Sequence, residues 1–132
     1  MKYLLDTNIC VYFLRQNTKI VEKLASIASD DLAISCFNLA ELLYGAHNSD
    51  FVGKNLARVR YIENTIEVLP FDRKAIENFA VLKADLRKQG RLIDDFDMLI
   101  AAVALSNKMI LVTNNQRHFE RIPNLTIENW LL

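Results

Sequence analysis

A chain of 132 residues is the usual size of one domain, so a single domain is predicted over residues 1–132. Hydrophobic residues make up 52% of it and only three Gly and two Pro interrupt it, which favours a well-packed core and excludes a disordered protein. Lys and Arg balance Asp and Glu at 16 each, so bulk electrostatic capture of nucleic acid is not expected, although an acidic pocket within a basic rim would also sum to zero.

Short apolar runs alternate along the chain with longer segments of helix-forming composition. Strands are predicted at residues 2–5, 32–35, 66–69, 109–112 and 125–128, each brief and rich in branched or aromatic side chains. Helices are predicted at residues 18–28, 37–46, 52–64, 73–89 and 96–106. Thr18 and Asp72 are expected to cap two of these helices, and Gly90 to end the fourth. This alternation predicts an α/β fold with a short, mostly parallel five-stranded sheet covered on both faces.

Cysteine usage and hydropathy together favour a cytoplasmic protein. Cys10 and Cys36 lie in apolar segments and have no partner at metal-ligand spacing, so both are expected to be small buried side chains in a reducing compartment. The longest uninterrupted apolar run, residues 98–105, is far shorter than the ~20 residues that cross a bilayer. We therefore expect no export segment and no membrane partner.

The residues that follow the strands are the first candidates for chemistry, because ligands of open parallel sheets bind beyond the carboxyl ends of the strands. Asp6 follows the first strand directly, where it could cap the next helix, bind a metal or do both. Glu41 lies soon after the second strand among almost entirely apolar neighbours. An ionised Glu in such surroundings is unfavourable unless it binds a metal or pairs with an Arg or Lys, and the sequence leaves both alternatives open.

Two further candidates belong to the second half of the chain. Asp97 stands three residues after Asp94, at the start of a helix that is apolar all round. The helix dipole favours acidic residues there, but it does not explain why Asp97 intrudes on the first apolar turn. Asn115 follows the fourth strand and is compatible with either a polar turn or a neutral oxygen ligand. The roles of Asp94 and Asn114 stay open.

Taken together, Asp6, Glu41 and Asp97 predict one acidic pocket that holds a metal ion. Carboxylates that converge repel one another strongly unless a cation neutralises them. A ligand set of oxygens without His or Cys selects a hard ion, so Mg²⁺ is the expected cofactor and Mn²⁺ the alternative. Such a site suits the hydrolysis of phosphate esters, and Asn115 completes the predicted catalytic set.

The chain resembles the PIN-domain ribonucleases, and more narrowly the VapC toxins of bacterial VapBC toxin–antitoxin modules. The resemblance runs from end to end through an ordered set of motifs, which are Leu5-Asp6-Thr7-Asn8, Ala40-Glu41-Leu42 with Gly45, Asp97 with Leu99-Ile100-Ala101-Ala102, Val112-Thr113-Asn114-Asn115, Phe119-Glu120-Arg121 with Pro123 and Leu125, and Glu128-Asn129-Trp130. It implies a three-layer α/β/α sandwich of the PIN type. By match of position, it implies that Asp6, Glu41 and Asp97 are the acidic metal ligands.

The chain departs from the family pattern at two positions near this pocket. The family often has a fourth acidic residue where this chain has Asn115, which leaves the predicted pocket one charge weaker. Glu120 is the residue that could compensate. Asp94 stands where the family often carries glycine, so it is an extra carboxylate.

The resemblance implies an endoribonuclease toxin that hydrolyses phosphodiester bonds in a structured RNA, either transfer RNA or ribosomal RNA, and so inhibits translation. It also implies a cognate VapB antitoxin whose C-terminal tail occupies a groove of the toxin, a homodimer, and a toxin–antitoxin hetero-oligomer. The alternative is a catalytically inactive PIN fold that serves as a scaffold or antitoxin-binding protein, and Asn115 is the best support for it. Bound RNA would need cations around the pocket. The candidates are Arg15, Lys19, Lys83, Arg87, Arg91, Arg117 and Arg121.

Overall fold

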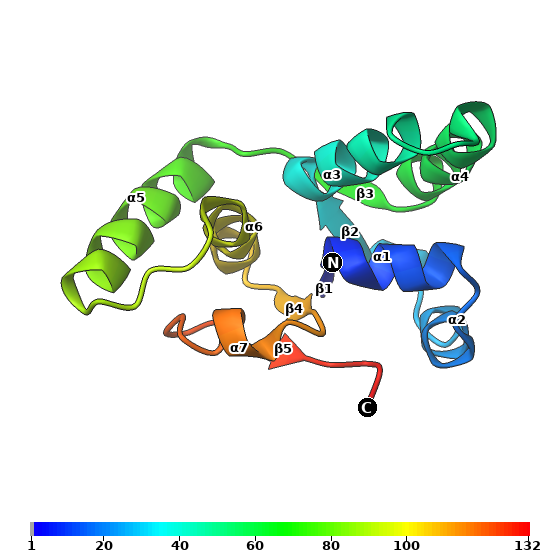
Figure 1. Cartoon of the computed structure of the whole chain (residues 1–132). Helices are drawn as coiled ribbons and strands as arrows, with labels where there is room; N and C mark the ends of the chain where they lie inside the picture. Colours follow the sequence, from blue (N-terminus) through cyan, green and yellow to red (C-terminus); the bar gives the residue numbers. More distant parts are fainter. Residues whose placement is uncertain (1) are drawn as a thin grey trace.

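A sheet of five parallel strands forms the middle of the molecule in the computed structural model, which describes residues 2–132 (Figure 1). The strands are β1 (Tyr3–Leu5), β2 (Leu32–Ser35), β3 (Glu67–Leu69), β4 (Ile110–Val112) and β5 (Ile127–Glu128). Their spatial order is β3-β2-β1-β4-β5. The chain moves outward from β1 on one side and then returns to the other side, so a topological switch point lies between β1 and β4. Ligands bind at such a point in open α/β sheets.

Helices cover both faces of the sheet. They are α1 (Thr7–Leu14), α2 (Thr18–Ala25), α3 (Cys36–His47), α4 (Val52–Thr65), α5 (Arg73–Lys88), α6 (Asp95–Ser106) and α7 (Gln116–Phe119), with a 3₁₀ turn at Ser29–Asp31. The five predicted strands and the five predicted helices are confirmed, with ends that differ by a few residues. Helices α1 and α7 lie outside the predicted ranges, because α1 is too apolar to show a helical period and α7 is a single turn.

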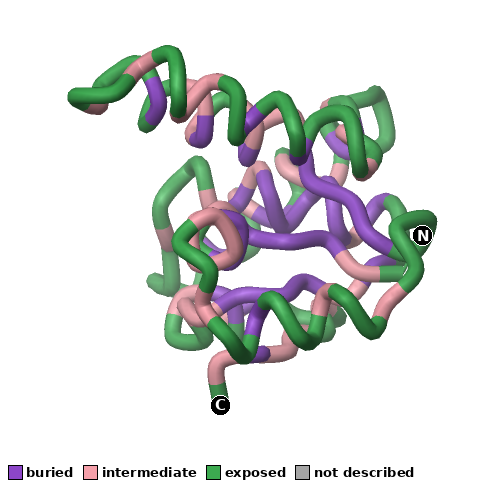
Figure 2. Tube along the Cα trace, turned by 90° about the vertical axis from the view of Figure 1, so that its right-hand side faces the viewer, coloured by how far each residue is buried: buried purple, intermediate pink, exposed green. Residues whose placement is uncertain are grey.

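The strand side chains alternate between two hydrophobic cores, and this alternation defines three layers. Leu4 and Leu111 face the core that α5, α6 and α7 complete. Leu5, Ile34 and Val112 face the opposite core, which α1 to α4 complete. Figure 2 shows the buried strands between helices whose outer turns are exposed. The predicted α/β/α sandwich is confirmed, and the sheet proves to be parallel throughout.

Two local predictions need correction. Asn17, and not Thr18, caps α2, because the Asn17 side chain accepts a hydrogen bond from the N–H of Ile20 at 3.2 Å and Thr18 is already helical. Asn and Thr are both good caps, so the sequence alone does not choose between neighbours. Cys10 is buried as predicted, but Cys36 is only half-buried at the start of α3; both thiols are free. The predicted cap Asp72 is confirmed by its 3.0 Å bond from the N–H of Ala75.

Helix α6 accounts for the long apolar run of residues 98–105. Most of its side chains are buried, as expected for a short helix packed between the sheet and α5. Among the helices formed by residues 2–132, none is both long and apolar enough to cross a membrane.

The C-terminus of α5 ends in a turn that requires Gly90. The N–H of Gly90 donates to the carbonyl of Arg87 at 3.1 Å, and the N–H of Arg91 donates to the carbonyl of Leu86 at 2.8 Å. This pair of bonds is a Schellman motif, and it places Gly90 at a φ of 66°, in the left-handed region. The prediction that Gly90 stops the helix is confirmed.

We predict that Gly90→Ala lowers the free energy of unfolding by about 1 kcal/mol, because a Cβ is strained in the left-handed region. Gly90→Asn should lose less, since Asn tolerates this conformation. Urea unfolding followed by circular dichroism measures both. An equal loss in the two variants would contradict the assignment.

Candidate functional site

Asp6 lies at the switch point of the sheet, between the carboxyl ends of β1 and β4. Leu5 pairs with Val112 in the parallel ladder, so the residues that follow the two strands are neighbours. The Thr113 hydroxyl donates to Asp6 Oδ2 at 2.8 Å, and the N–H of Thr7 donates to Asp6 Oδ1 at 2.8 Å. Asp6 is 6% exposed and also caps α1. The two alternatives for Asp6, helix cap and site residue, are therefore compatible in geometry.

Glu41 is held by a chain of hydrogen bonds that begins at the start of α3. The N–H and the hydroxyl of Ser35 donate to Asn38 Oδ1 at 2.9 and 2.7 Å, so the other atom of that buried amide must be nitrogen. Asn38 Nδ2 donates to Thr7 Oγ1 at 3.0 Å, which leaves the Thr7 proton to be donated to Glu41 Oε1 at 2.5 Å. Glu41 is half-buried and has no salt bridge among residues 2–132, so the ion-pair alternative is wrong.

Asp97, in the first turn of α6, contacts a histidine that sequence reasoning did not select. His118 Nδ1 lies 2.8 Å from Asp97 Oδ2, and the side-chain nitrogen of Asn115 lies 3.0 Å from the same ring nitrogen. The backbone N–H of Asn115 donates to the Thr113 hydroxyl oxygen at 2.9 Å. Asn115 therefore reaches Asp97 only through His118. The predicted set of oxygen ligands thus has a histidine beside it, which contacts Asp97.

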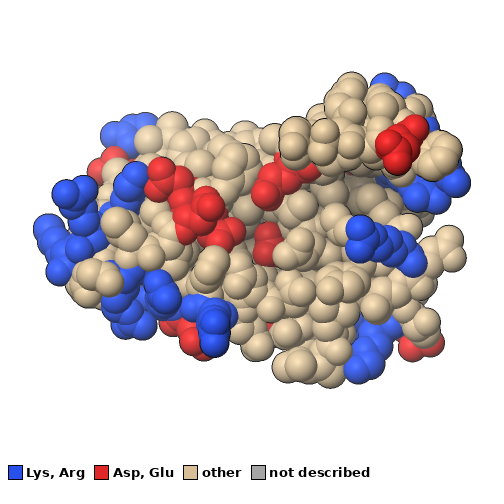
Figure 3. Space-filling model, viewed as in Figure 1, with Lys and Arg blue, Asp and Glu red and all other residues tan. Residues whose placement is uncertain are grey.

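Burial and neighbouring charge act together on Asp6. The pKa of its carboxyl group is raised from 3.8 to about 6, chiefly by burial and against the opposing hydrogen bonds from Thr113 and Thr7. The charges of Asp97 and Glu41 are smaller contributions to the same rise. Glu41 and Asp97 therefore both lie close enough to repel the charge of Asp6. Figure 3 shows acidic side chains around a hollow in the middle of this face, with Lys and Arg side chains on both sides of it.

The other polar candidates lie around the edge of this group. Asp94 is exposed and caps α6, where its side chain accepts a hydrogen bond from the N–H of Phe96 at 2.8 Å. Asn114 accepts from the side chain of Asn8 at 3.4 Å, which links the end of β4 to the start of α1. Glu120 is exposed at the end of α7 and is not among the charges that raise the pKa of Asp6.

Several predicted RNA contacts are engaged within the protein. Lys83 pairs with Asp95 at 3.0 Å. Lys19 and Arg121 donate to backbone carbonyl oxygens, each at 3.2 Å. These three side chains are less available to a phosphate than the sequence implied.

The donor set suits a hard cation in its chemistry, because three carboxylates supply oxygen ligands and excess negative charge. Across residues 2–132, however, no three Asp, Glu, His or Cys side chains are close enough together to enclose an ion as they stand. Glu41 is turned to Thr7, and Asp97 is turned to His118. Rotation of these two side chains would free their oxygens toward Asp6. The metal ligands remain a prediction.

Four polar side chains that orient the carboxylates were missed from the sequence. They are Thr7, Asn38, Thr113 and His118. The spacing of Asn115 and His118 was an available signal, because residues three apart on a helical turn share a face. Asn38 offered none, since its contact with Thr7 joins residues 31 positions apart.

Comparison with known proteins identifies the class of protein that this fold and this group of carboxylates define. The fold, with carboxylates at the switch point of a parallel sheet, is that of a PIN domain, and the family described as "PIN domain" matches residues 3–125. The chain is 37% identical over 130 residues to the tRNA(fMet)-specific endonuclease VapC of Shigella flexneri, and the matched residues cover 98% of each chain. It is also 37% identical over 131 residues to ribonuclease VapC2 of Haemophilus influenzae, and here the matched residues cover 99% of each chain.

Solved structures agree with these relatives. DNA-bound VapBC from Salmonella typhimurium is similar with a TM-score of 0.93 and 37% identity, over 98% of both chains. VapBC2 from Rickettsia felis is similar with a TM-score of 0.92 and 36% identity, over 98% of this chain and 99% of that one. The chain belongs to the VapC ribonuclease family of PIN-domain proteins, as the resemblance in its motifs predicted.

We predict that Asp6 makes the metal-free protein less stable as the pH rises. Its folded-state pKa is raised, so its stabilising contribution is complete below pH 3.8 and is lost as the pH rises through about 6. Asp6→Asn removes the buried charge and should be more stable than wild type at pH 8, by on the order of 1–2 kcal/mol. This difference should shrink at pH 4.5.

Urea unfolding in a chelator at both pH values measures this difference. Asp31→Asn, at an exposed carboxylate, is the matched control and should change little. An Asp6→Asn protein that is less stable than wild type at pH 8 would show that the ionised carboxylate does not destabilise the folded protein.

Proposed function

We propose that this chain is a metal-dependent endoribonuclease that acts as the toxin of a VapBC-type pair. One observation carries the proposal: the carboxylates Asp6, Glu41 and Asp97 meet at the switch point of the sheet closely enough for two of them to raise the pKa of the third. The near full-length likeness to VapC ribonucleases supports it.

Asp6, Glu41 and Asp97 are the residues that would hold Mg²⁺, with Mn²⁺ as a substitute. When bound, such an ion activates water and stabilises negative charge on a phosphate. The protein's own contribution is a concentration of negative charge in a site where Asp6 is almost fully buried. A cation there would neutralise the charges of Glu41 and Asp97, which add to the effect of burial on the pKa of Asp6.

The neighbouring polar side chains set the direction of each carboxylate. Two donors, the Thr113 hydroxyl and the N–H of Thr7, fix both oxygens of Asp6. The Thr7 hydroxyl orients Glu41, and the ring of His118 orients Asp97. These contacts hold Asp6 in place, whereas Glu41 and Asp97 would exchange their bonds to Thr7 and His118 for the ion when it binds.

For the substrate, we propose a structured RNA that takes part in translation. Transfer RNA is the preferred candidate and ribosomal RNA the second. The relatives from Shigella flexneri and Salmonella typhimurium, 37% and 35% identical to this chain, are both named tRNA(fMet)-specific endonuclease VapC. Initiator tRNA is therefore the first substrate to test. Its hydrolysis would inhibit translation.

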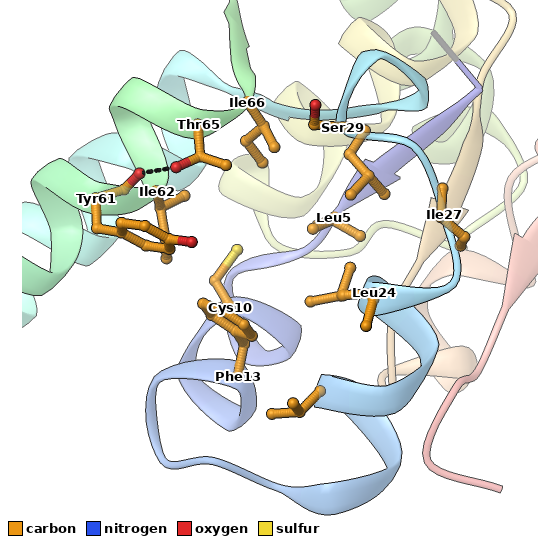
Figure 4. A pocket seen from close by; sticks show the side chains of 13 residues that line it. Leu5, Cys10, Phe13, Leu24, Ile27, Ser29, Tyr61, Ile62, Thr65 and Ile66 are labelled. Atoms are coloured by element: carbon orange, nitrogen blue, oxygen red, sulfur yellow. Dashed lines mark hydrogen bonds between the residues drawn. The ribbon is translucent and has the colours of Figure 1, made fainter.

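For the partner, we propose a VapB-type antitoxin, within a hetero-oligomer that contains a homodimer of this chain. The similar solved structures include VapBC complexes. An apolar pocket of about 280 Å³ between α1, α2 and α4 suits a hydrophobic segment of such a partner. Figure 4 shows Phe13, Leu24 and Tyr61 around it. The side chains of Val21 and Tyr61 are 36% and 59% exposed, so part of this surface is open to solvent.

We predict that the purified protein cleaves tRNA(fMet) with Mg²⁺ and stops when a chelator is added. Asp6→Asn and Asp97→Asn should each lower kcat/KM at least about 100-fold, because each removes a charge that the ion needs. Denaturing gels with end-labelled tRNA measure the rates.

Asp94→Asn is the matched control, since Asp94 caps the same helix as Asp97 but lies outside the group of three. It should cleave at the wild-type rate. If Asp97→Asn cuts as fast as wild type, the site assignment is wrong. A wild-type protein that cuts no RNA and does not arrest growth when expressed alone favours the inactive scaffold.

We also predict that Val21→Glu weakens antitoxin binding at least about 10-fold, because a charge would be buried against an apolar partner segment. Ribonuclease activity of the free protein should remain. Titration calorimetry with the VapB-type partner measures the affinity. Val81→Glu is the control, at an exposed valine of α5 on the opposite layer. Equal affinities of the two variants would place the antitoxin elsewhere.

A further inference from the structure

A groove adjoins the acidic site on the side of α1, α3 and α4. It has a volume of about 330 Å³ and shares Thr7 and Glu41 with the acidic site. Its lining also includes Arg15, Gly45 and Arg58. The groove therefore continues from the carboxylates along one side of the molecule, and it is distinct from the apolar pocket.

The two arginines of this groove are free to bind a ligand. Arg15 ends α1 and Arg58 lies in α4, and both are exposed. In the part of the chain that the structure describes, neither guanidinium forms a salt bridge, whereas Arg73 pairs with Glu77 at 2.8 Å. A planar guanidinium without a carboxylate partner is a strong donor group for a phosphate.

Gly45 is the second observation that indicates a ligand. It lies in the interior of α3 without a positive φ, where alanine would form a better helix. A Cβ added there would meet nothing within 4 Å, so packing within the chain does not require glycine either. Gly53 of α4 also meets nothing within 4 Å, so the feature that distinguishes Gly45 is its place on the wall of the groove. Glycine there lets the backbone of a ligand approach the helix closely.

We propose that this groove binds the RNA strand next to the bond that is cut. Gly45 admits the sugar–phosphate backbone against α3, and Arg15 and Arg58 bind phosphates that flank the scissile one. The inference rests on the proposed ribonuclease function and adds the path of the substrate to it. It also explains how a chain with a net charge of zero holds RNA, because the positive charge needed for contact is local.

Matched glycine variants test the groove wall. Gly45→Leu and Gly53→Leu both place a good helix former in a helix, and at both positions a Cβ meets nothing within 4 Å. Gly53 does not line the groove. Both variants should raise the melting temperature by about 2–5 °C. Only Gly45→Leu should raise the Kd for tRNA(fMet), at least about 10-fold, in fluorescence anisotropy with proteins that also carry Asp97→Asn, which slows cleavage.

Arginine variants test the phosphate contacts. Arg15→Gln and Arg58→Gln should each raise the Kd and the KM for tRNA(fMet) about 5–10-fold, with a smaller effect on kcat. Each should also reduce the slope of log Kd against log salt concentration by about 0.7, the loss of one phosphate contact on a single strand. Arg60→Gln is the control, at an exposed arginine of α4 that does not line the groove.

The outcomes separate this inference from the proposed function. If the wild type cleaves tRNA(fMet) but the groove variants bind and cleave it like Gly53→Leu and Arg60→Gln, the groove assignment is overturned and the ribonuclease stands. If the groove variants lose affinity only for the antitoxin, the groove belongs to a protein partner and the inference is again overturned. If the wild type neither binds nor cleaves any RNA, both proposals fail.

Discussion

The repulsion between carboxylates at one edge of the sheet is the constraint on which the rest of the site depends. Asp6 is nearly inaccessible to water, and the charges of Asp97 and Glu41 add to the effect of its burial on its pKa. Such a grouping is unfavourable for the folded protein by itself. It persists because it comes from the packing: Asp6 follows β1 and caps α1, and α3, which carries Glu41, contacts both α1 and α6, the helix of Asp97. A cation would turn this unfavourable feature into affinity.

The polar groups around the carboxylates explain why each carboxylate has a defined position despite this electrostatic repulsion. Across residues 2–132, no buried side-chain nitrogen or oxygen lacks a hydrogen-bond partner. The bonds from Ser35 through Asn38 and Thr7 to Glu41 have only one possible direction, since they begin at a backbone N–H. A buried network that is fully satisfied is rigid, so each carboxylate has a defined position in the protein without an ion.

The layer formed by α1 to α4 carries both proposed binding surfaces. Cys10 and Phe13 of α1 line the apolar pocket, while Val11 and Arg15 of the same helix line the groove beside the acidic site. The two surfaces differ in chemistry as their proposed partners do, since one is apolar and the other offers free guanidinium groups. The opposite layer, with α5 and α6, serves mainly as core, and Asp97 is its contribution to the site.

The α/β class and the strands could be predicted from the sequence, because they depend on local patterns of brief apolar runs and helix signals. The same patterns place Asp6 directly after a strand and Asp97 at the start of a helix. The choice between metal ligand and ion pair for Glu41 could not be predicted, since it depends on which side chain from a distant segment comes to face it. The same holds for Asn38, Thr113 and His118, whose partners lie far away in the chain or across the sheet. Local sequence determined that Asp6 follows a strand, that Asp97 lies in the first turn of a helix and that Glu41 lies within one. Only the packing of the layers decided that they meet, because strand order is a property of the whole sheet.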